Sequence, residues 1–426
     1  MLFLQAIPDR DGVTMASDWA GGGTRGEPVP ALSRGTTQTG VRLYNERLAL
    51  SLIRKHGSLP KAEIARLTGL SAQTVSVIVR QLERDGLLRR ENPMRGKVGQ
   101  PLVPFTLNPD GAFAIGLKVG RRSGDLMLLD LAGKVRNTIH QPYSFPAPQE
   151  MLRFVESGVE SLISGLDAGQ RKRISGLGIA APFELWNWEE EMGAPHAVLE
   201  SWRGFDLASE IAQLFDWPIH FCNDATAACA AELLFGKGRE LRDYGYFYMG
   251  YFIGGGIVVN GTLLQGPRGN AGALGSFPVP TPAGGIQQLI RTASFAVLEQ
   301  VLKAGGKDPA MLWRTDNDWS EVGPALGHWI ETAATGLACA SAGIACINEP
   351  AAIVIDGAMP PNVRTRLTQA VREAVLKINM QGISPFTVVE GTIGADARAM
   401  GAASLPLFAN FIIDRDVLFK ETVEAG

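Results

Sequence analysis

A helical repeat of apolar residues near the N-terminus constrains the fold of this chain more than any other feature. Four apolar residues recur at i, i+3, i+4 and i+7, the spacing that places side chains on one buried helix face. They are Val75, Ile78, Val79 and Leu82. Ser71 precedes this run as a good N-cap, and Arg84 stands before the Asp-Gly pair that closes it. The segment predicts a helix with a polar outer face.

Two further helices are expected over 41–56 and 61–67, and a short turn with Gly69 joins the second to the helix just described. Residues 87–90 and 102–107 then flank a basic, glycine-containing loop, a pattern that indicates a two-stranded wing. We therefore predict a winged helix-turn-helix domain over 41–108. Residues 1–40, rich in Gly, Pro, Ser and Thr, are expected to form a disordered tail.

The charge of this segment indicates a nucleic-acid partner. Residues 41–100 hold 12 Lys/Arg and 5 Asp/Glu, a local charge of +7 in a chain whose net charge is -3. A recognition helix needs small or amide residues at its N-terminus to reach bases, and cations to hold phosphates. The candidate DNA-binding residues are Ser71, Ala72, Gln73, Thr74, Ser76 and Arg80, with Arg95, Lys97 and Gln100 on the wing. A helical hairpin with a merely solvated basic face is the alternative.

Beyond residue 108 apolar strands alternate with helical segments, which predicts an α/β arrangement in two lobes. We expect the first lobe over 112–224, the second over 225–400, and a C-terminal segment over 401–426 that returns to the first. A helix is expected over 285–303 and a strand over 244–252.

Other classes of protein are disfavoured by the sequence. The N-terminus lacks a basic leader, and about 18 uninterrupted apolar residues occur nowhere, so we expect a soluble, cytoplasmic protein. Four cysteines lack a CxxC pair and nearby histidines at ligand spacing, which favours buried thiols over a disulfide framework or a metal site. They are Cys222, Cys229, Cys339 and Cys346.

Two motifs in the α/β region carry polar or glycine residues at places suited to ligands. Asn223 and Asp224 end an apolar strand and begin an Ala-rich helix, so they either bind vicinal hydroxyls, with Asp224 as a general base, or simply cap the helix. The run 254–256 is three glycines, a weak signal for a phosphate cradle, and Asn260-Gly261 strongly predicts a hairpin turn.

In combination and in order, these motifs resemble the regulator branch of the ROK family of repressors and sugar kinases, from Val41 onward. The resemblance is carried by the helix-turn-helix, the wing run 99–101, the loop 178–182, Asn223-Asp224, the triple glycine and the run 269–272. It implies an actin-like (ribonuclease H-like) two-lobed fold behind the winged helix-turn-helix, a sugar in the interlobe cleft, and a homodimer or homotetramer.

The sequence departs from the family pattern at the positions that bind phosphate and zinc. Lys118 and Arg122 stand where family kinases have the Asp and Thr of a phosphate loop, and Phe252 replaces a small glycine, so we expect kinase activity to be lost and ATP not to bind. The family's Glu and His correspond to Ala273 and Ser276, and 279–288 lacks the zinc-binding cysteines, so we expect no zinc.

The leading hypothesis is a sequence-specific repressor of carbohydrate uptake or catabolic genes, controlled by a sugar, polyol or sugar phosphate. The candidate effector-binding residues are Asn223, Asp224, Gly269, Asn270, Ala273 and Ser276. One alternative is a ROK-type sugar kinase with a vestigial DNA-binding segment. The other is a ligand-free oligomerisation platform.

Overall fold

The computed structural model describes residues 38–93, 102–183, 185–187, 195–266, 269–281, 284–314 and 318–412. One compact unit runs from Asn45 to Ile413. The first turns of helix α1 precede it, because α1 spans Gln38–His56 and so begins three residues before the expected start at Val41. Most of the expected tail lies outside the described residues, as do Arg95, Lys97 and Gln100 of the expected wing loop.

The predicted helix-turn-helix is present in the structure. Its elements after α1 are β1 (Leu59–Pro60), α2 (Lys61–Thr68), α3 (Ala72–Arg84), β2 (Leu88–Arg90) and β3 (Pro104–Leu107). Gly69 ends α2 in the left-handed conformation at φ 71°, where glycine carries no steric cost. Ile53, Ile64 and Val79 are each 0% exposed in the shared core. The sequence did not predict β1, which pairs with β3 as a third strand.

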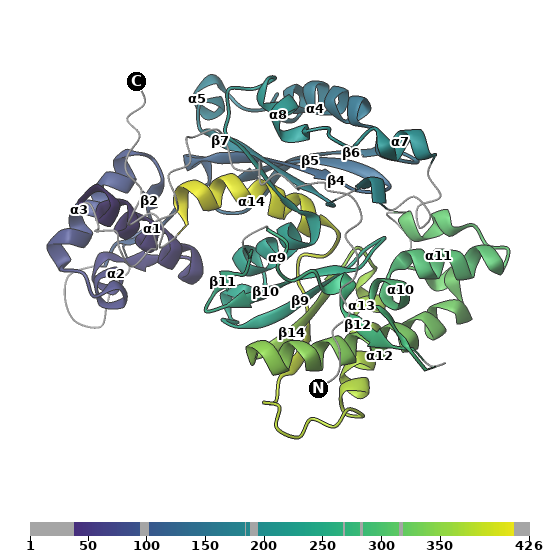
Figure 1. The fold of residues 1–426 in the computed structure, drawn as a ribbon. Helices are drawn as coiled ribbons and strands as arrows, with labels where there is room; N and C mark the ends of the chain where they lie inside the picture. The colour runs from purple at the N-terminus through teal and green to yellow at the C-terminus, as the bar shows by residue number, and fades with distance from the viewer. Residues whose placement is uncertain are drawn as a thin grey trace, which may run out of the picture. The chain divides into compact units, whose positions relative to one another are not determined.

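The first sheet has the strand order β6-β5-β4-β7-β8. Its strands are β4 (Phe113–Val119), β5 (Ser123–Asp130), β6 (Val135–Pro142), β7 (Ile174–Ala181) and β8 (Ile219–Asn223). Strands β4, β5 and β6 are antiparallel, whereas β7 and β8 continue parallel to β4. Helices α4 (Pro148–Leu162) and α8 (Leu207–Ala212) cover one face, and the C-terminal helix α14 (Ala397–Phe411) covers the other (Figure 1).

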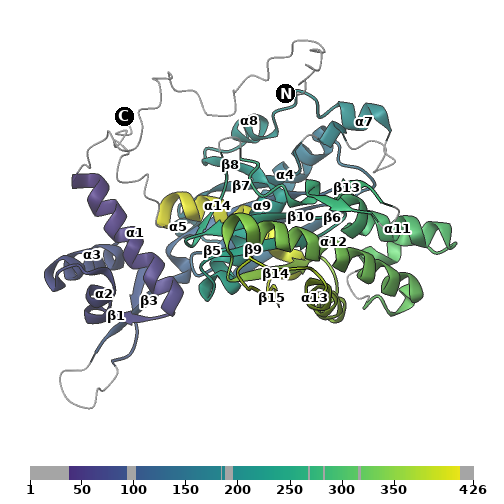
Figure 2. The ribbon, with the colours of Figure 1, turned by 60° about the horizontal axis from the view of Figure 1, so that its bottom comes forward.

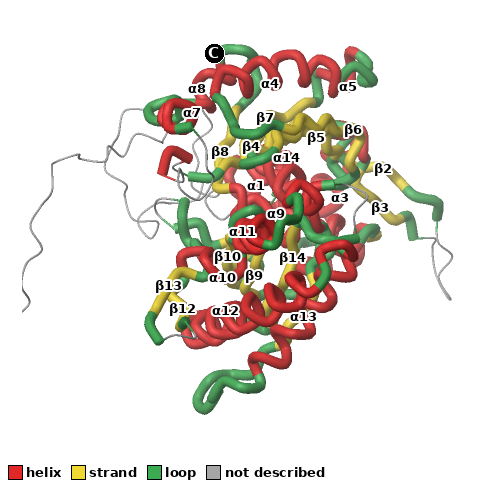
Figure 3. Tube along the Cα trace, turned by 90° about the vertical axis from the view of Figure 1, so that its right-hand side faces the viewer, coloured by secondary structure: helices red, strands yellow, loops and turns green. Residues whose placement is uncertain are grey.

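The second sheet has the order β11-β10-β9-β14-β15. Its strands are β9 (Tyr244–Met249), β10 (Gly254–Val259), β11 (Thr262–Leu263), β14 (Ala352–Gly357) and β15 (Thr387–Glu390). Helix α9 (Asp224–Phe235) packs on one face, and α12 (Pro324–Asn348) and α13 (Pro361–Val375) pack on the other. Figure 3 shows α14 and α9 between the two sheets.

Shorter elements complete the two lobes (Figure 2). The helices are α5 (Ala168–Arg171), α7 (His196–Glu200), α10 (Ile290–Ala293) and α11 (Phe295–Ala304), and a hairpin consists of β12 (Pro278–Pro280) and β13 (Ile286–Gln288). The 3-10 turns are η2 (Pro109–Gly111), η3 (Leu185–Asn187), η4 (Lys237–Arg239), η5 (Leu274–Ser276), η6 (Pro309–Trp313), η7 (Ser320–Val322) and η8 (Gly394–Asp396).

The expected two-lobed α/β architecture is confirmed, with local corrections. The single helix expected over 285–303 is wrong, because the segment begins as strand β13 and its helices break at Ser294. The Ser294 hydroxyl accepts a hydrogen bond from the Ile253 amide at 3.0 Å, and its carbonyl accepts one from the Trp329 indole at 3.1 Å, so tertiary contacts fix the break. The strand expected to reach Phe252 ends at Met249. The domain limits expected at 108, 224 and 400 stay predictions.

Helix α12 is long and apolar enough to cross a membrane by length and composition. However, 56% of its most apolar window is buried inside the protein, and Trp329 and Leu337 pack in the core of the second lobe. Its apolar character is therefore accounted for by packing beside α13 in the apolar core of the second lobe.

Small residues let α14 approach both lobes closely. A Cβ added at Gly178 in β7 would lie 1.9 Å from the Ala402 carbonyl oxygen, and one added at Gly116 in β4 would lie 2.3 Å from that of Ala399. On the opposite side, a Cβ at Gly401 would lie 1.8 Å from the carbonyl oxygen of Ala227 in α9. No side chain fits at these positions, so α14 is wedged between the first sheet and α9.

We expect Gly401→Ala to lower the free energy of unfolding by at least about 2 kcal/mol, because the added methyl meets backbone that must shift. Gly327→Ala in α12 is the matched control, since nothing lies within 4 Å of its added Cβ and alanine favours helix. Urea unfolding of both variants measures the difference. Equal stability of the two variants would contradict the close packing of α14.

Candidate DNA-binding surface and interlobe site

The N-terminal turn of α3 presents polar side chains to solvent. The Ser71 hydroxyl caps the helix by accepting a hydrogen bond from the Thr74 amide at 3.1 Å, and both side chains are exposed. Gln73 and Arg80 are also exposed, whereas Val75, Ile78, Val79 and Leu82 are buried as expected. The helix therefore has the outer face that the sequence predicts.

Two of the candidate DNA-binding residues on α3 are held by hydrogen bonds within the domain. Ser76 is half-buried, and its hydroxyl accepts a hydrogen bond from the Lys61 ammonium at 3.4 Å. The Arg80 guanidinium lies along the helix, donating to the Ser76 carbonyl at 3.1 Å. Lys61, which the sequence analysis did not single out, adds a cation beside this surface. The excess of basic residues over 41–100, to which Lys61 contributes, was the signal that could have identified it.

Both lobes contact the DNA-binding domain through arginines. Arg173, just before β7, donates to the carbonyl oxygens of Asp85 at 3.1 Å and Gly111 at 3.0 Å. Arg239, in η4 of the second lobe, donates to the Arg54 carbonyl at 3.0 Å, at the end of α1. Phe411 of α14 packs against the apolar cluster of the winged domain and against that beneath the first sheet. Both lobes are therefore in direct contact with the winged domain.

Asn223 and Asp224 lie where the first sheet ends and α9 begins. The Asn223 side-chain oxygen accepts hydrogen bonds from the amides of Ala225 at 3.0 Å and Thr226 at 3.4 Å, so it caps the helix. Asp224 is 9% exposed, and its carboxylate accepts a hydrogen bond from the Arg398 guanidinium at 3.2 Å. Asn223 thus caps the helix, which is one of the two roles considered for this motif. Asp224 forms an ion pair with Arg398.

Lys118 lies near this ion pair, at the end of β4. Its ammonium donates to the Ser123 hydroxyl at 2.7 Å and to the Asp125 carboxylate at 2.5 Å. Asp125 also contacts the imidazole of His140 on β6. Burial, reinforced by the nearby Arg398 guanidinium, lowers the pKa of Lys118 to about 8.

Arg121 and Phe252 meet across the two lobes. The Arg121 guanidinium carbon lies 4.3 Å from the centre of the Phe252 ring, a cation–π contact between the loop after β4 and the loop before β10. Burial lowers the pKa of Arg121 to about 10, with Asp224 opposing this shift and Arg398 adding to it. Large side chains thus occupy both loops, Arg121 the loop after β4 and Phe252 the loop before β10.

The remaining effector candidates follow β10. Close packing holds their loop, since a Cβ at Gly275 would lie 2.3 Å from the Ile253 carbonyl oxygen. Ala273, Ser276 and Asn270 are exposed, and Gly269 is half-buried with φ 70°. A Cβ at Gly254 would lie 2.4 Å from that of Ala225, so strand β10 connects this loop with the start of α9.

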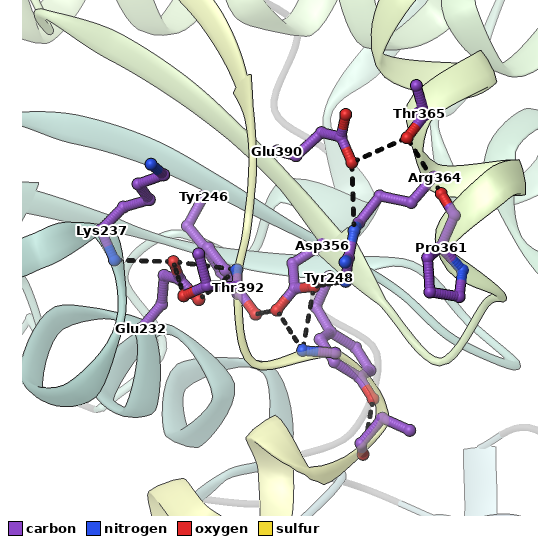
Figure 4. A network of polar contacts seen from close by, with 12 residues as sticks. Glu232, Lys237, Tyr246, Tyr248, Asp356, Pro361, Arg364, Thr365, Glu390 and Thr392 are labelled. Atoms are coloured by element: carbon purple, nitrogen blue, oxygen red, sulfur yellow. Dashed lines mark hydrogen bonds and ion pairs between the residues drawn. The ribbon is translucent and has the colours of Figure 1, made fainter.

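A buried polar network lies in the second lobe, outside the residues expected from the sequence (Figure 4). Asp356 at the end of β14 is 0% exposed and accepts hydrogen bonds from the Tyr246 hydroxyl at 3.0 Å and the Arg364 guanidinium at 3.0 Å. Glu232 of α9 accepts from the Thr392 amide at 3.1 Å and the Lys237 amide at 2.8 Å. Because the carboxylates of Asp356 and Glu232 both accept hydrogen bonds from neighbouring donors, we interpret the network as structural.

The residues present do not fit a structural zinc. Val279 and Leu289, in and beside the β12–β13 hairpin, are 0% exposed and belong to the apolar core of the lobe. Within the described ranges, no group of three or more His, Cys, Asp or Glu is placed to hold a metal ion. Apolar packing stabilises this hairpin instead.

Comparisons with protein families agree with this organisation. Residues 114–289 match the model of the ROK family, and residues 42–89 match a winged helix-turn-helix DNA-binding model. The chain is 26% identical to the uncharacterized protein y4fQ of Sinorhizobium fredii, over 86% of this chain and 91% of that one. It is also 26% identical to the xylose repressor of Bacillus spizizenii, over 57% of this chain and 62% of the repressor.

Solved structures share the fold. A ROK family transcriptional regulator, described as a homolog of the Escherichia coli MLC protein, matches with a TM-score of 0.63 at 19% identity, covering 89% of this chain and 98% of that one. A ROK family glucokinase from Streptomyces griseus, bound to glucose and AMPPNP, matches with a TM-score of 0.54 at 21% identity, covering 69% and 99%. The fold is therefore common to a regulator and a kinase and does not by itself separate them.

We expect Lys118 to make stability rise with pH above neutrality. Its pKa of about 8 lies below the ordinary 10.5, so the buried charge penalises the folded state below pH 8, and the penalty falls as pH rises toward 10.5. Relative to Lys118→Met, the wild type should gain about 2 kcal/mol between pH 7 and 9.5. Urea unfolding of both proteins at both pH values measures this gain, and parallel pH dependence would contradict it.

Proposed function

We propose that this chain, whose residues 42–89 match a winged helix-turn-helix model and whose residues 114–289 match the ROK family model, is a cytoplasmic repressor of carbohydrate uptake or catabolic genes. Under this proposal it acts as a homodimer or homotetramer, and a sugar-type effector between the lobes controls its affinity for an operator. The observation that carries the proposal is the exposed polar face of α3 on a domain that both lobes contact through arginines.

Recognition of DNA would use the first turn of α3. Gln73 carries an amide suited to a bidentate contact with adenine in the major groove. Thr74 and Ser71 are exposed beside it, and Arg80 and Lys61 supply cations for phosphates. Arg95, Lys97 and Gln100 of the expected wing loop, outside the described residues, remain proposed contacts with the backbone or the adjacent groove.

The effector site would be built around Asn223 and Asp224, with Gly269, Asn270, Ala273 and Ser276 as further candidates. Helix α14 offers the route from this site to DNA. Arg398 near its first residue pairs with Asp224, and Phe411 at its last residue packs on the winged domain, about 20 Å away along the helix. We propose that effector binding shifts α14 relative to the lobes and so changes the spacing of paired recognition helices.

Loss of kinase activity belongs to the same proposal. Phosphoryl transfer needs a metal and phosphates held in line, but Lys118 places a buried cation at the first phosphate-loop position. Arg398 holds the carboxylate of Asp224, the candidate general base, in an ion pair.

Two alternative functions lead to different experimental results. Consumption of ATP with a hexose, abolished by Asp224→Asn, would establish a kinase; gene regulation unaffected by Asn223→Ala and Asp224→Ala would favour a ligand-free platform.

DNA binding is tested with an operator selected from random DNA. We expect Arg80→Ala to weaken binding and to reduce the slope of log affinity against log salt by about 1, because one phosphate contact is lost. We expect Gln73→Ala to relax discrimination at one base pair by about 1–3 kcal/mol. Fluorescence anisotropy over a salt series measures both effects.

Arg153→Ala is the matched control for this experiment, since Arg153 is an exposed arginine on α4 of the first lobe. Its salt slope should equal that of the wild type. If Arg80→Ala and Gln73→Ala bind every sequence as the wild type does, α3 is not the recognition helix.

A further inference from the structure

We propose that Val77 on α3 is a base-reading residue whose methyl groups pack on the 5-methyl group of a thymine in the operator. This inference rests on the proposed function, because it names one feature of the DNA that the same helix would recognise. It adds an apolar residue to the polar candidates that the sequence analysis placed on α3. The thymine would lie close to the base pair that Gln73 contacts.

Val77 lies at the centre of the exposed face of α3, although its side chain is apolar. Successive residues of an α-helix turn by about 100° around its axis, so Val77 stands opposite the buried face of α3. Its side chain is 53% exposed. The other exposed large apolar residues described in the winged domain are all less exposed, and they are Val41, Leu67 and Leu102.

A valine is an unfavourable choice at an exposed position of a helix. Its β-branched side chain loses rotational freedom in the helix, and its methyl groups stay in contact with water. The exposed positions of α3 from Gln73 onward are otherwise polar or charged, namely Gln73 itself, Thr74, Arg80 and Arg84. A position that departs from the local rules of propensity and polarity is expected where a function requires the residue.

Val77 follows Gln73 by one turn on the same side of the helix. Residues four apart lie beside each other on a helix surface and are separated by about 6 Å along the axis. Adjacent base pairs of duplex DNA are about 3.4 Å apart. A helix that lies in the major groove would therefore present Val77 within about two base pairs of the pair that Gln73 contacts.

The chemistry of Val77 selects thymine among the four bases. Thymine carries a 5-methyl group on its major-groove edge, whereas the edges of the other three bases present donors or acceptors without a methyl group. The isopropyl group of valine has no donor or acceptor, so it would leave those edges without hydrogen-bond partners and would bury apolar surface only against the methyl group.

The charge around α3 favours DNA over another protein surface as the partner of Val77. Residues 41–100 carry a local charge of +7, which complements the phosphates on both sides of a groove. The Arg80 side chain is exposed three residues after Val77. The single apolar contact would thus be made inside an interface that electrostatic attraction to phosphates forms.

Binding of the full chain to an operator selected from random DNA tests the proposal by fluorescence anisotropy. Each thymine is replaced in turn by 2′-deoxyuridine, which keeps the base pair and removes only the 5-methyl group. We expect one such position in each half-site to raise the Kd of the wild type about fourfold, the effect of losing one buried methyl group. It should lie within about two base pairs of the pair at which Gln73→Ala relaxes discrimination.

Val77→Ala should bind the thymine operator and the deoxyuridine operator with equal Kd, because it lacks the methyl groups that make the contact. The variant should fold, since Val77 is exposed and alanine favours helix. Val41→Ala is the matched control, because it truncates another exposed valine of the same domain, on α1. This control should keep the preference of the wild type for thymine.

Three results would overturn the proposal. The first is an operator in which no thymine replacement changes the Kd of the wild type. The second is a sensitive thymine far from the pair that Gln73 contacts. The third is a preference for thymine that Val77→Ala retains, which would assign the methyl contact to another group. In each case selective operator binding leaves the regulator proposal standing, whereas failure to bind operator DNA would defeat the proposed function itself.

Discussion

The close contact of helix α14 with both lobes is the constraint on which the rest of the structure depends. Glycines on β4, β7 and α14 itself remove the side chains that would keep the backbones apart. The helix is therefore packed by backbone against the first sheet on one side and against α9 on the other. Packing of this kind leaves little room for added side chains and resists gradual deformation.

The position of α14 also determines the chemistry of the interlobe site. It brings Arg398 to Asp224 across 174 positions of sequence, and it places the same guanidinium beside Lys118 and Arg121. At this site Asp224, the candidate general base, pairs with Arg398. Arg398 is buried there together with Lys118 and Arg121. The ion pair with Arg398 opposes the use of Asp224 as a base toward a hydroxyl.

Much of this organisation could be predicted from the sequence, because helical periodicity, caps and turn residues are local signals. The bounds of α3 were predicted to the residue, and Asn260 and Gly261 adopt the positive φ values of the expected hairpin turn. Strand β6 was missed because it is an edge strand with mostly exposed, polar residues. Helix α14 was missed because small residues and an internal Pro406 hide its period, and burial on several sides leaves no polar stripe. The Asp224–Arg398 pair had no local signal at all.

The central claim is that α14 transmits the state of the interlobe site to the DNA-binding domain. Hydrogen–deuterium exchange of Arg398→Gln against the wild type tests it without any ligand, because the substitution breaks the ion pair at the first turn of the helix. The account predicts faster exchange far from the substitution, in peptides covering residues 405–412 and 45–56. Changes confined to the neighbourhood of Asp224 and Lys118 would contradict it.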